Sequence, residues 1–379
     1  MLKLFSALST WQPTGRLILE LNAYSPSDKE HWFKNYHFGR KHEEVGDLVQ
    51  QQEATARWHD PNHGWVNGQQ VEAPCVSAIL RLFSPLCLGL PKDLPEVQAV
   101  TGLLIHRQLR RQIYPAILRQ LWEKLPRLES IVYEPWRVWR RPWKIMCDRE
   151  LASAIQDALP SHVRTVSIFE DFNDHLASAI RSDPPYLGTI DTSPIADLML
   201  VMLVKALASK SRDFEHLSIS YMIDAQQFFN SCELSYTWHH LQSLALTSST
   251  LTQTAPRKEI STLLNNASLA ALNMPQLESM VFWNGKPGEA CAVFYHRNKA
   301  SGQATLTWHG TWDLELSHDV VESWQKVASD TCLQIKSERV QGVINSHGDA
   351  IYQLRLPGGV IDPISLWQIR QEGKMQSMT

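Results

Sequence analysis

Five short runs of alternating apolar and polar residues recur through the middle of the chain. Each begins with an apolar residue, continues with polar residues and ends in an alternating apolar stretch, and they span residues 125–133, 159–168, 214–220, 241–246 and 274–282. Alternation over four to eight residues indicates a β-strand with one buried face. The pattern therefore predicts five strands, centred near Ile131, Val166, Leu217, Leu244 and Met280.

Helical periodicity occurs between and before these runs. Apolar residues recur every three or four positions over residues 97–122, 149–159 and 196–208. This spacing is typical of helices with one buried side. A succession of strand, helix and strand favours a parallel sheet with helices packed on it.

The repeated unit resembles the core of a leucine-rich repeat, in which a helix or turn connects one short strand to the next. Positions 131, 166, 217, 244 and 280 are separated by 35, 51, 27 and 36 residues, whereas regular repeats measure about 20–29 residues. The prediction is an α/β fold: an irregular leucine-rich-repeat-like solenoid with a parallel sheet and flanking helices, capped by a C-terminal α+β region.

The two ends of the chain differ from the middle. Residues 1–80 contain a helix-like start, a predicted strand at 16–21 and a polar loop rich in His and Trp. The N-terminal region is taken as residues 1–90, and this pattern predicts an N-terminal cap with loops. The repeats would then occupy residues 91–290 and the C-terminal cap residues 291–379, all within a single repeat-like domain covering 1–379.

The C-terminal cap has its own pattern. Residues 292–295 and 304–308 alternate and are separated by a polar loop, which predicts a β-hairpin. A helix over residues 318–329 and two later strands are expected to complete the cap.

Composition and charge exclude several classes of protein. The chain has 36 Lys and Arg against 39 Asp and Glu, a net charge of -3, and 14 Trp among 379 residues. A chain so rich in aromatics is not disordered, and without a positive field nucleic acid is not an expected partner. The Trp content needs another explanation.

Targeting and cofactor signals are absent from the sequence. The longest apolar run, Leu198–Val204 between Asp197 and Lys205, is too short for a membrane span. Six scattered Cys without a CxxC pair indicate reduced thiols and no zinc site, so we expect a cytoplasmic protein with no metal. No GxGxxG, GxxxxGK[ST], HExxH or GxSxG motif occurs, so we expect no cofactor.

Charged residues follow two neighbouring predicted strands. Glu134 and Arg137 come after the strand near Ile131, and Glu170 and Asp171 come after the strand near Val166. Loops at the ends of parallel strands commonly carry function, and paired carboxylates can act as acid and base. The simpler alternative is a structural ion pair for Glu134 and Arg137, and helix capping for Glu170 and Asp171.

Aromatic residues also occupy predicted loops. Together with Asn284, these aromatic side chains could line a pocket for an apolar ligand. His31, Tyr36 or Arg137 would then donate a hydrogen bond to a ligand carbonyl. The aromatic candidates are Trp32, Trp65, Trp136, Phe172 and Trp283. The simpler alternative for each aromatic residue is a place in the core.

Several phrases together resemble a filamentous-fungal family of F-box-associated proteins with a C-terminal domain of unknown function. The resemblance extends over essentially the whole chain. The segments that carry it are LNAYSPSD from Leu21, EHWFKNY from Glu30, WHD from Trp58, VYEPWR from Val132, FEDF from Phe169, FWNG from Phe282, WHGTW from Trp308 and SHGDA from Ser346. Members of that family often begin with an F-box, which docks the ubiquitin-ligase adaptor Skp1. No such segment precedes Leu19 here.

The sequence features and the family resemblance lead to two hypotheses about function. The first is binding of a small apolar metabolite, with catalysis of a pericyclic cyclisation of the Diels–Alder type in terpenoid or polyketide metabolism, which needs only positioning and hydrogen bonding. The catalytic candidates are then His31, Tyr36, Glu134, Arg137, Glu170 and Asp171. The second is a protein-recognition module, the substrate receptor of an F-box protein in ubiquitin ligation.

Overall fold

The structure is a computed structural model of the 379-residue chain. It describes residues 1–23, 59–60, 65–66, 69–70, 76, 79–80, 83–109, 111–173, 176–178, 180, 194–233, 235–298, 302–329 and 331–376.

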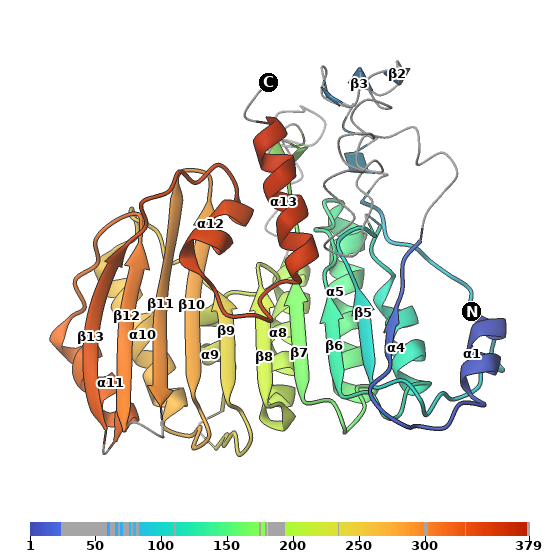
Figure 1. Cartoon of the computed structure of the whole chain (residues 1–379), viewed down its shortest axis with the longest axis horizontal. Coiled ribbons are helices and arrows are strands. Elements are labelled where there is room, and N and C mark those ends of the chain that lie inside the picture. Colours follow the sequence, from blue (N-terminus) through green and yellow to red (C-terminus); the bar gives the residue numbers. More distant parts are fainter. Residues whose placement is uncertain are drawn as a thin grey trace.

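A ten-stranded sheet forms the centre of the fold (Figure 1). Its strands follow one another across the sheet in chain order, and neighbours are parallel except at β10–β11 and β11–β12, which are antiparallel. The strands are β1 (Ile18–Glu20), β5 (Gly102–Ile105), β6 (Ser130–Tyr133), β7 (Thr165–Phe169), β8 (His216–Ser220), β9 (Ser243–Thr247), β10 (Ser279–Lys286), β11 (Glu289–Asn298), β12 (Gln303–Gly310) and β13 (Cys332–Arg339).

A second, three-stranded antiparallel sheet is made of two-residue strands. They are β2 (His59–Asp60), β3 (Trp65–Val66) and β4 (Gln69–Gln70).

Most helices lie along one face of the large sheet, behind it in Figure 1, and this is called the helix face. They are α4 (Pro115–Glu123), α5 (Arg141–Asp157), α8 (Pro194–Lys210) with the 3-10 helix η3 (Ser211–Asp213), α9 (Ala225–Asn230), α10 (Arg257–Ala271) and α11 (His318–Ala328). The opposite, front face carries α12 (His347–Leu354) and α13 (Pro363–Gln376), while α1 (Leu2–Leu8) lies beyond the β1 edge.

The main core lies between the sheet and the helix face. Its strand residues form one continuous row in register across six parallel strands, and all are buried: Leu103, Ile131, Val166, Leu217, Leu244 and Met280. Side chains alternate between the faces of a strand, so the residues on either side of this row face the front. The sequence pattern of alternating residues is therefore the pattern of a sheet covered by helices on one side.

A smaller core lies on the front face. It joins Phe169, Ala245, Val281 and Trp283 of the sheet to apolar residues of the segment that contains α12 and α13. Ser167 Oγ adds a hydrogen bond of 2.7 Å to the Gly359 carbonyl. The C-terminal segment thus packs on the part of the front face nearest the carboxyl ends of β7–β10.

Local signals fix where several helices begin. Pro115 starts α4 at a position where its missing N–H costs no hydrogen bond. Asp224 caps α9 by accepting from the Gln226 amide at 2.8 Å, and Ser346 caps α12 by accepting from the Asp349 amide at 3.2 Å. The left-handed Arg355, with φ 54°, ends α12.

The structure confirms a mixed α/β fold with a mostly parallel sheet, and all five predicted strands are present. The predicted hairpin is also present as β11–β12. The helices predicted at 149–159, 196–208 and 318–329 correspond to α5, α8 and α11, although α5 ends two residues and α11 one residue before the predicted end. The solenoid architecture and its leucine-rich-repeat character stay predictions.

Two local predictions are wrong. Residues 97–122 are not one helix, because β5 occupies Gly102–Ile105 and only α4 is helical there. The apolar run Leu103–Ile105 belongs to the core row, and a buried strand cannot be told from a helix by periodicity alone. After β13 the chain forms the helices α12 and α13 instead of a second strand.

Candidate functional site

Polar side chains gather where three neighbouring strands end. His106 and Arg107 follow β5, Glu134 follows β6, and Glu170 and Asp171 follow β7. The carboxyl ends of parallel strands lie at one edge of a sheet, so these residues become neighbours although they are far apart in the sequence. All five are buried. They are called the carboxyl-edge cluster.

Arg107 lies at the centre of this cluster. Its Nε donates to Asp171 Oδ2, its Nη2 donates to Glu372 Oε2 at 2.7 Å, and its Nη1 donates to Glu372 Oε1 and Gln368 Oε1 at 3.2 and 3.1 Å. The guanidinium also lies 4.8 Å from the ring centroid of Trp136. With 1% of its surface exposed, Arg107 connects the ends of β5 and β7 to helix α13.

Asp171 has partners on both carboxylate oxygens. Oδ1 accepts from the Phe172 amide at 2.8 Å and lies 2.9 Å from His347 Nε2 on α12, while Oδ2 accepts from Arg107. Burial raises the pKa of this carboxyl, but the charge of Arg107 and the bond to His347 outweigh it and hold the pKa at about 2. Asp171 is therefore a permanently charged partner for Arg107 and α12.

Glu134 is bound to the start of α13. Its Oε1 accepts from the Asp362 amide at 2.8 Å, and its Oε2 accepts from the Ser365 hydroxyl and from the Arg107 amide at 3.2 Å. His106 Nδ1 lies 3.3 Å from the same Oε2. Three donors and the neighbouring imidazole thus surround this buried carboxylate, in the way that buried polar groups require.

Ser365, His106 and Glu134 are three residue types that also form hydrolase triads, but their geometry is different. In a triad the carboxylate and the serine bind opposite nitrogens of the imidazole. Here Ser365 Oγ donates to Glu134 and lies 3.5 Å from Nδ1, the nitrogen that also faces the carboxylate. Ser365 is fully buried, so this arrangement holds α13 and does not activate a nucleophile.

Glu170 and Arg137 form the outer part of the cluster. Arg137 Nε donates to Glu170 Oε2 at 2.8 Å, and Lys144 Nζ lies 3.7 Å from Oε1. Burial raises the pKa of Glu170, yet the charges of Lys144 and Arg137 outweigh this and lower it below its usual value. Arg137 also lies 4.8 Å from the centroid of the Phe172 ring, and this pair borders the cluster.

Aromatic rings line the front of the cluster. The His347 ring stacks on Phe172 with 4.5 Å between centroids, and Tyr221 meets Phe172 edge-on at 4.9 Å and Trp283 at 5.1 Å. Tyr221 has φ 61° and donates its hydroxyl to the Gly285 carbonyl at 2.8 Å. These contacts connect the ends of β7, β8 and β10 to α12.

The structure brings together many of the residues that the sequence singles out. Glu134, Arg137, Glu170 and Asp171 lie in or beside the cluster with Trp136 and Phe172, as the strand-end argument expects. Their catalytic and ligand-binding roles stay predictions. What the structure adds is that the three carboxylates each have cationic or hydrogen-bonding partners.

Other candidates lie elsewhere. Trp283 is fully buried in the front-face core, and Asn284 donates to the Leu251 carbonyl at 3.1 Å. The backbone of Trp65 lies in β3. His31, Trp32 and Tyr36 lie outside the described residues.

Sequence reasoning missed the residues that close the cluster. Arg107 sits inside the stretch that the periodicity assigned to a helix, and Ser365, Gln368 and Glu372 belong to α13, which was not predicted. The one available signal was the i, i+3, i+7 spacing of these three polar residues, which places them on one side of a helix. His347 belongs to the segment SHGDA, which carries part of the family resemblance, but the sequence pattern assigns it no role.

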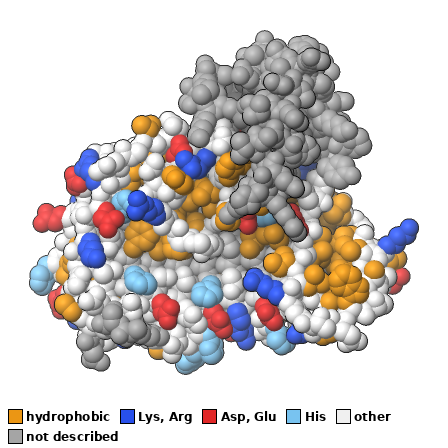
Figure 2. All heavy atoms as spheres, viewed as in Figure 1, with side chains coloured by type: hydrophobic (Ala, Val, Ile, Leu, Met, Phe, Trp, Pro, Cys, Tyr) orange, Lys and Arg blue, Asp and Glu red, His pale blue; other side chains and the backbone are white. Residues whose placement is uncertain are grey.

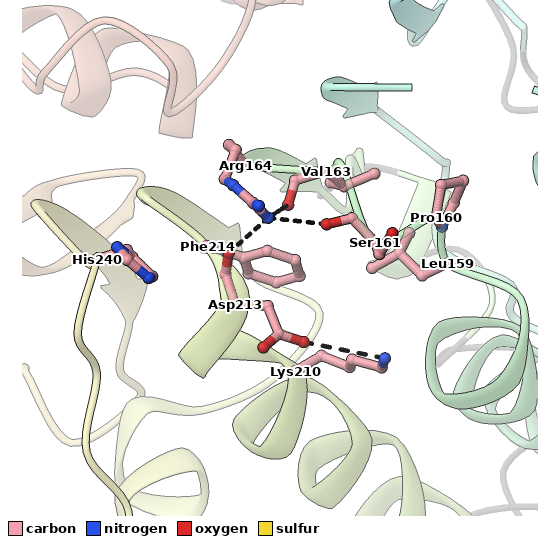
Figure 3. Close-up of a pocket in the computed structure, with 9 residues that line it drawn as sticks. All are labelled: Leu159, Pro160, Ser161, Val163, Arg164, Lys210, Asp213, Phe214 and His240. Atoms are coloured by element: carbon pink, nitrogen blue, oxygen red, sulfur yellow. Dashed lines mark hydrogen bonds and ion pairs between the residues drawn. The ribbon is translucent and has the colours of Figure 1, made fainter. Parts of the chain in front are cut away.

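The opposite edge of the sheet, at the amino ends of β7–β9, holds a pocket of about 260 Å³ (Figure 3). Arg164 crosses it and donates through Nη1 to the carbonyls of Ser161, Val163 and Asp213 at 2.9–3.2 Å. Lys210 Nζ lies 4.0 Å from Asp213, and Phe214 forms part of the wall. The pocket is small for a ligand of drug size. The hydrogen bonds of Arg164 connect the loops that precede β7 and β8.

A row of polar, uncharged residue types crosses the front face below the C-terminal segment. In register across eight strands it contains Ser130, Thr165, His216, Ser243, Ser279, His296, Thr305 and Gln334. Each is half-buried or exposed, and the set is called the uncovered row. Figure 2 shows acidic, basic and histidine side chains interspersed over this lower part of the front face.

The described residues contain neither a metal-binding cluster nor a membrane-spanning helix. No group of three or more His, Cys, Asp or Glu side chains in that part of the chain is arranged to hold a metal ion. Among the same residues, no helix has the length and apolar character needed to cross a bilayer.

Comparison with known proteins gives a family but no activity. A family of unknown function, DUF6546, matches residues 158–362, more than half of the 379 residues. The chain belongs to this family. No curated protein and no solved structure matches it. The DUF6546 match covers β7 to α12 and ends just before α13, so it includes Asp171, His347 and most of the uncovered row.

Proposed function

We propose that this DUF6546 protein is a protein-recognition module that binds an extended segment of a partner across the uncovered row. The observation that carries the proposal is the difference between the two faces of the sheet: one is covered by helices, and the other leaves a continuous row of Ser, Thr, His and Gln accessible. Hydroxyl and imidazole groups both donate and accept hydrogen bonds, which suits them to contact a peptide backbone.

The dimensions of the row favour a macromolecule. Strands lie about 4.8 Å apart, so eight strands give a row about 34 Å long. An extended peptide rises about 3.3 Å per residue, and about ten residues would span it. A small metabolite instead requires a concave, mostly apolar site that surrounds it, and the row is polar.

The charge of the surface favours protein over nucleic acid. Acidic and basic side chains are mixed on the front face (Figure 2), and the whole chain has a net charge of -3. Binding of phosphates requires clustered positive charge. Protein interfaces tolerate mixed charges at their rims.

The resemblance to F-box-associated proteins makes the proposal more specific. In a fungal F-box setting the module would select a protein for ubiquitin ligation, and the full-length protein would then bind Skp1. Cyclisation of an apolar metabolite stays a prediction, because three of the residues assigned to it lie outside the described part of the chain.

The test uses a double variant with bulky charges in the row, Ser243→Arg with Thr305→Arg. These half-buried residues lie on β9 and β12 of the front face. The matched control is Glu259→Arg, an exposed residue of α10 on the helix face. Tagged full-length proteins are compared by cross-linking and quantitative mass spectrometry in cells of the source organism.

We expect a partner that is recovered with the wild type and the control but reduced about tenfold or more with the double variant, a loss of about 1.4 kcal/mol. A synthetic peptide from that partner should then bind the purified wild type. Equal recovery with all three proteins, while the variants keep the wild-type melting temperature, would reject the proposal. Recovery of Skp1 decides separately whether ubiquitin ligation is involved.

A further inference from the structure

Helix α8 is apolar on nearly all sides. Its sequence is PIADLMLVMLVKALASK, and it contains the longest apolar run of the chain. A helix that is apolar all round is normally buried on all sides or spans a membrane. Only one side of α8 is buried, through Leu203, Val204, Ala206, Leu207 and Ala208, which pack in the main core.

The other side of α8 exposes large apolar side chains. Ile195 is 59% exposed, Leu198 54%, Val201 42% and Met202 43%. Their spacing of three, three and one places them on one side of a helix. Scattered exposed apolar residues are ordinary, but a continuous set on one helix marks a binding surface. These four residues are called the α8 stripe.

One charge of each sign lies on either side of Val201 along the helix. Asp197 and Lys205 are both exposed, and each is four residues from Val201. Neither forms an ion pair within the described chain. Since a helix rises about 1.5 Å per residue, the two charges are about 12 Å apart along the axis, too far to pair with each other.

We propose that the α8 stripe binds the α8 stripe of a second copy of this chain, with the two helices antiparallel around a two-fold axis at Val201. In that arrangement Asp197 lies opposite the partner's Lys205, and Lys205 lies opposite the partner's Asp197. The apolar side chains between them become buried. A two-fold interface brings the same patch from both subunits together, and this patch is complementary to itself only when antiparallel.

The observations favour a second copy over a membrane surface. Helices that lie on membranes carry several Lys and Arg beside their apolar face, whereas the exposed side of α8 has one Asp and one Lys. A single helix pair buries less than the roughly 1,600 Å² of a standard interface. We therefore expect a moderate dimer with a dissociation constant on the order of 10 µM.

The first experiment measures the oligomeric state of the full chain by sedimentation equilibrium over a range that extends to on the order of 100 µM, well above that dissociation constant. The wild type should form dimers, and Val201→Asp should stay a monomer because it places two carboxylates on the two-fold axis. The matched control is Leu269→Asp on α10, where the native Leu is 62% exposed outside the stripe. It should dimerise like the wild type.

The second experiment tests the antiparallel pairing by charge reversal. Asp197→Lys alone and Lys205→Asp alone should each weaken the dimer about tenfold, because each creates two like-charge contacts. Mixing these two variants should restore a heterodimer, detected by native mass spectrometry with subunits of different tag mass. The double variant Asp197→Lys with Lys205→Asp should also regain the wild-type affinity.

Several results would overturn the proposal. They are a wild type that stays monomeric at the highest concentration, a Val201→Asp variant that dimerises as the wild type does, or single charge variants that the mixture does not rescue. Circular dichroism and melting temperatures establish that each variant is folded. Since α8 lies on the helix face, the dimer and the proposed peptide binding at the uncovered row can succeed or fail independently.

Discussion

The carboxyl-edge cluster and the uncovered row belong to one sheet but are built in opposite ways. The cluster is charged and fully enclosed: Arg107 is 1% exposed, Glu134 1% and Asp171 0%, and the segment with α12 and α13 lies over it. The row consists of polar residues that bond to few neighbours and remain accessible. The cluster encloses paired charges away from water, whereas the row has uncharged hydroxyl, imidazole and amide side chains that water can reach.

This difference bears on which region meets a ligand. Ligands of parallel α/β proteins commonly bind outside the carboxyl ends of the strands. In this chain that position is occupied by its own C-terminal helices, and their polar residues Ser365, Gln368 and Glu372 take the contacts that a ligand would make. The strand-end residues therefore bond to the C-terminal helices of the same chain, and our proposal assigns recognition to the open face.

The sharpest way to break this comparison is to remove the charge at the centre of the cluster. Arg107→Met leaves Asp171 and Glu372 buried without their cation. We expect a loss of about 3–5 kcal/mol in the free energy of unfolding, since breaking one side of a buried pair leaves an uncompensated charge. Urea denaturation followed by circular dichroism measures it.

The control for that change is Arg339→Met. Arg339 is 57% exposed and pairs with Asp313 at 2.6 Å on the surface. Solvent screens such pairs, so its loss should cost no more than about 1 kcal/mol. If Arg107→Met cost as little as the control, the cluster would not hold the C-terminal helices.

The second largest effect is expected from acid, which should weaken the carboxyl-edge cluster. The pKa of Asp171 is about 2 in the folded chain and near its ordinary 3.8 in the unfolded chain. Its stabilising effect is present above the unfolded value and is lost as the pH falls toward 2, and a difference of about two units corresponds to roughly 2.5 kcal/mol. Glu170, whose pKa is also lowered, acts in the same direction.

Urea titrations between pH 5 and pH 2 of the wild type and of Asp171→Asn measure this effect, over the range in which a carboxylate with a lowered pKa takes up its proton. The variant begins less stable but should lose less stability on acidification. Parallel curves for the two proteins would show that Asp171 does not supply the acid dependence.

The sequence predicts the parts of the fold that depend on local pattern. Alternation around Val166 and Leu217 identifies β7 and β8, and helical spacing identifies α5 and α8. It fails for β5 because Leu103–Ile105 is a short buried run without a distinctive period. It misses α12 and α13 because their buried sides mix apolar residues such as Ile351 and Ile369 with polar ones such as His347 and Glu372, which weakens the usual amphipathic pattern.

The candidate site was predictable in part for a related reason. The strand-end rule places Glu134, Glu170 and Asp171 together because parallel strands share an edge. Asp171, however, is paired with Arg107 and His347, which lie 64 and 176 residues away along the chain, and Arg107 is paired with Glu372, 265 residues away. No periodicity in one sequence reports such a contact, so the sequence could not distinguish an open site from a closed one.

A smaller effect should come from the hydroxyl that holds α13. Ser365→Ala removes the donor to Glu134 Oε2, while the amides of Arg107 and Asp362 continue to donate to that carboxylate. The expected loss is about 1–2 kcal/mol, the usual effect of removing one partner from a buried hydrogen bond. Hydrogen exchange of the α13 amides should become faster while exchange in α10 stays the same. Faster exchange in both helices would point to global destabilisation instead of a local contact.

The smallest effect is expected in the uncovered row. Ser279→Ala removes the 3.0 Å bond from Ser279 Oγ to Ser243 Oγ, and the change in free energy of unfolding should stay below about 0.5 kcal/mol, as for most surface substitutions. The matched serine on the helix face is Ser211, which accepts from Trp238 Nε1 at 2.7 Å and is fully buried. Ser211→Ala should cost about 1–3 kcal/mol because it leaves the indole N–H without its acceptor. Urea denaturation of both variants under one set of conditions compares them directly. If Ser279→Ala cost as much as Ser211→Ala, the row would be part of the stabilising structure, and its residues would not be free to be selected for binding.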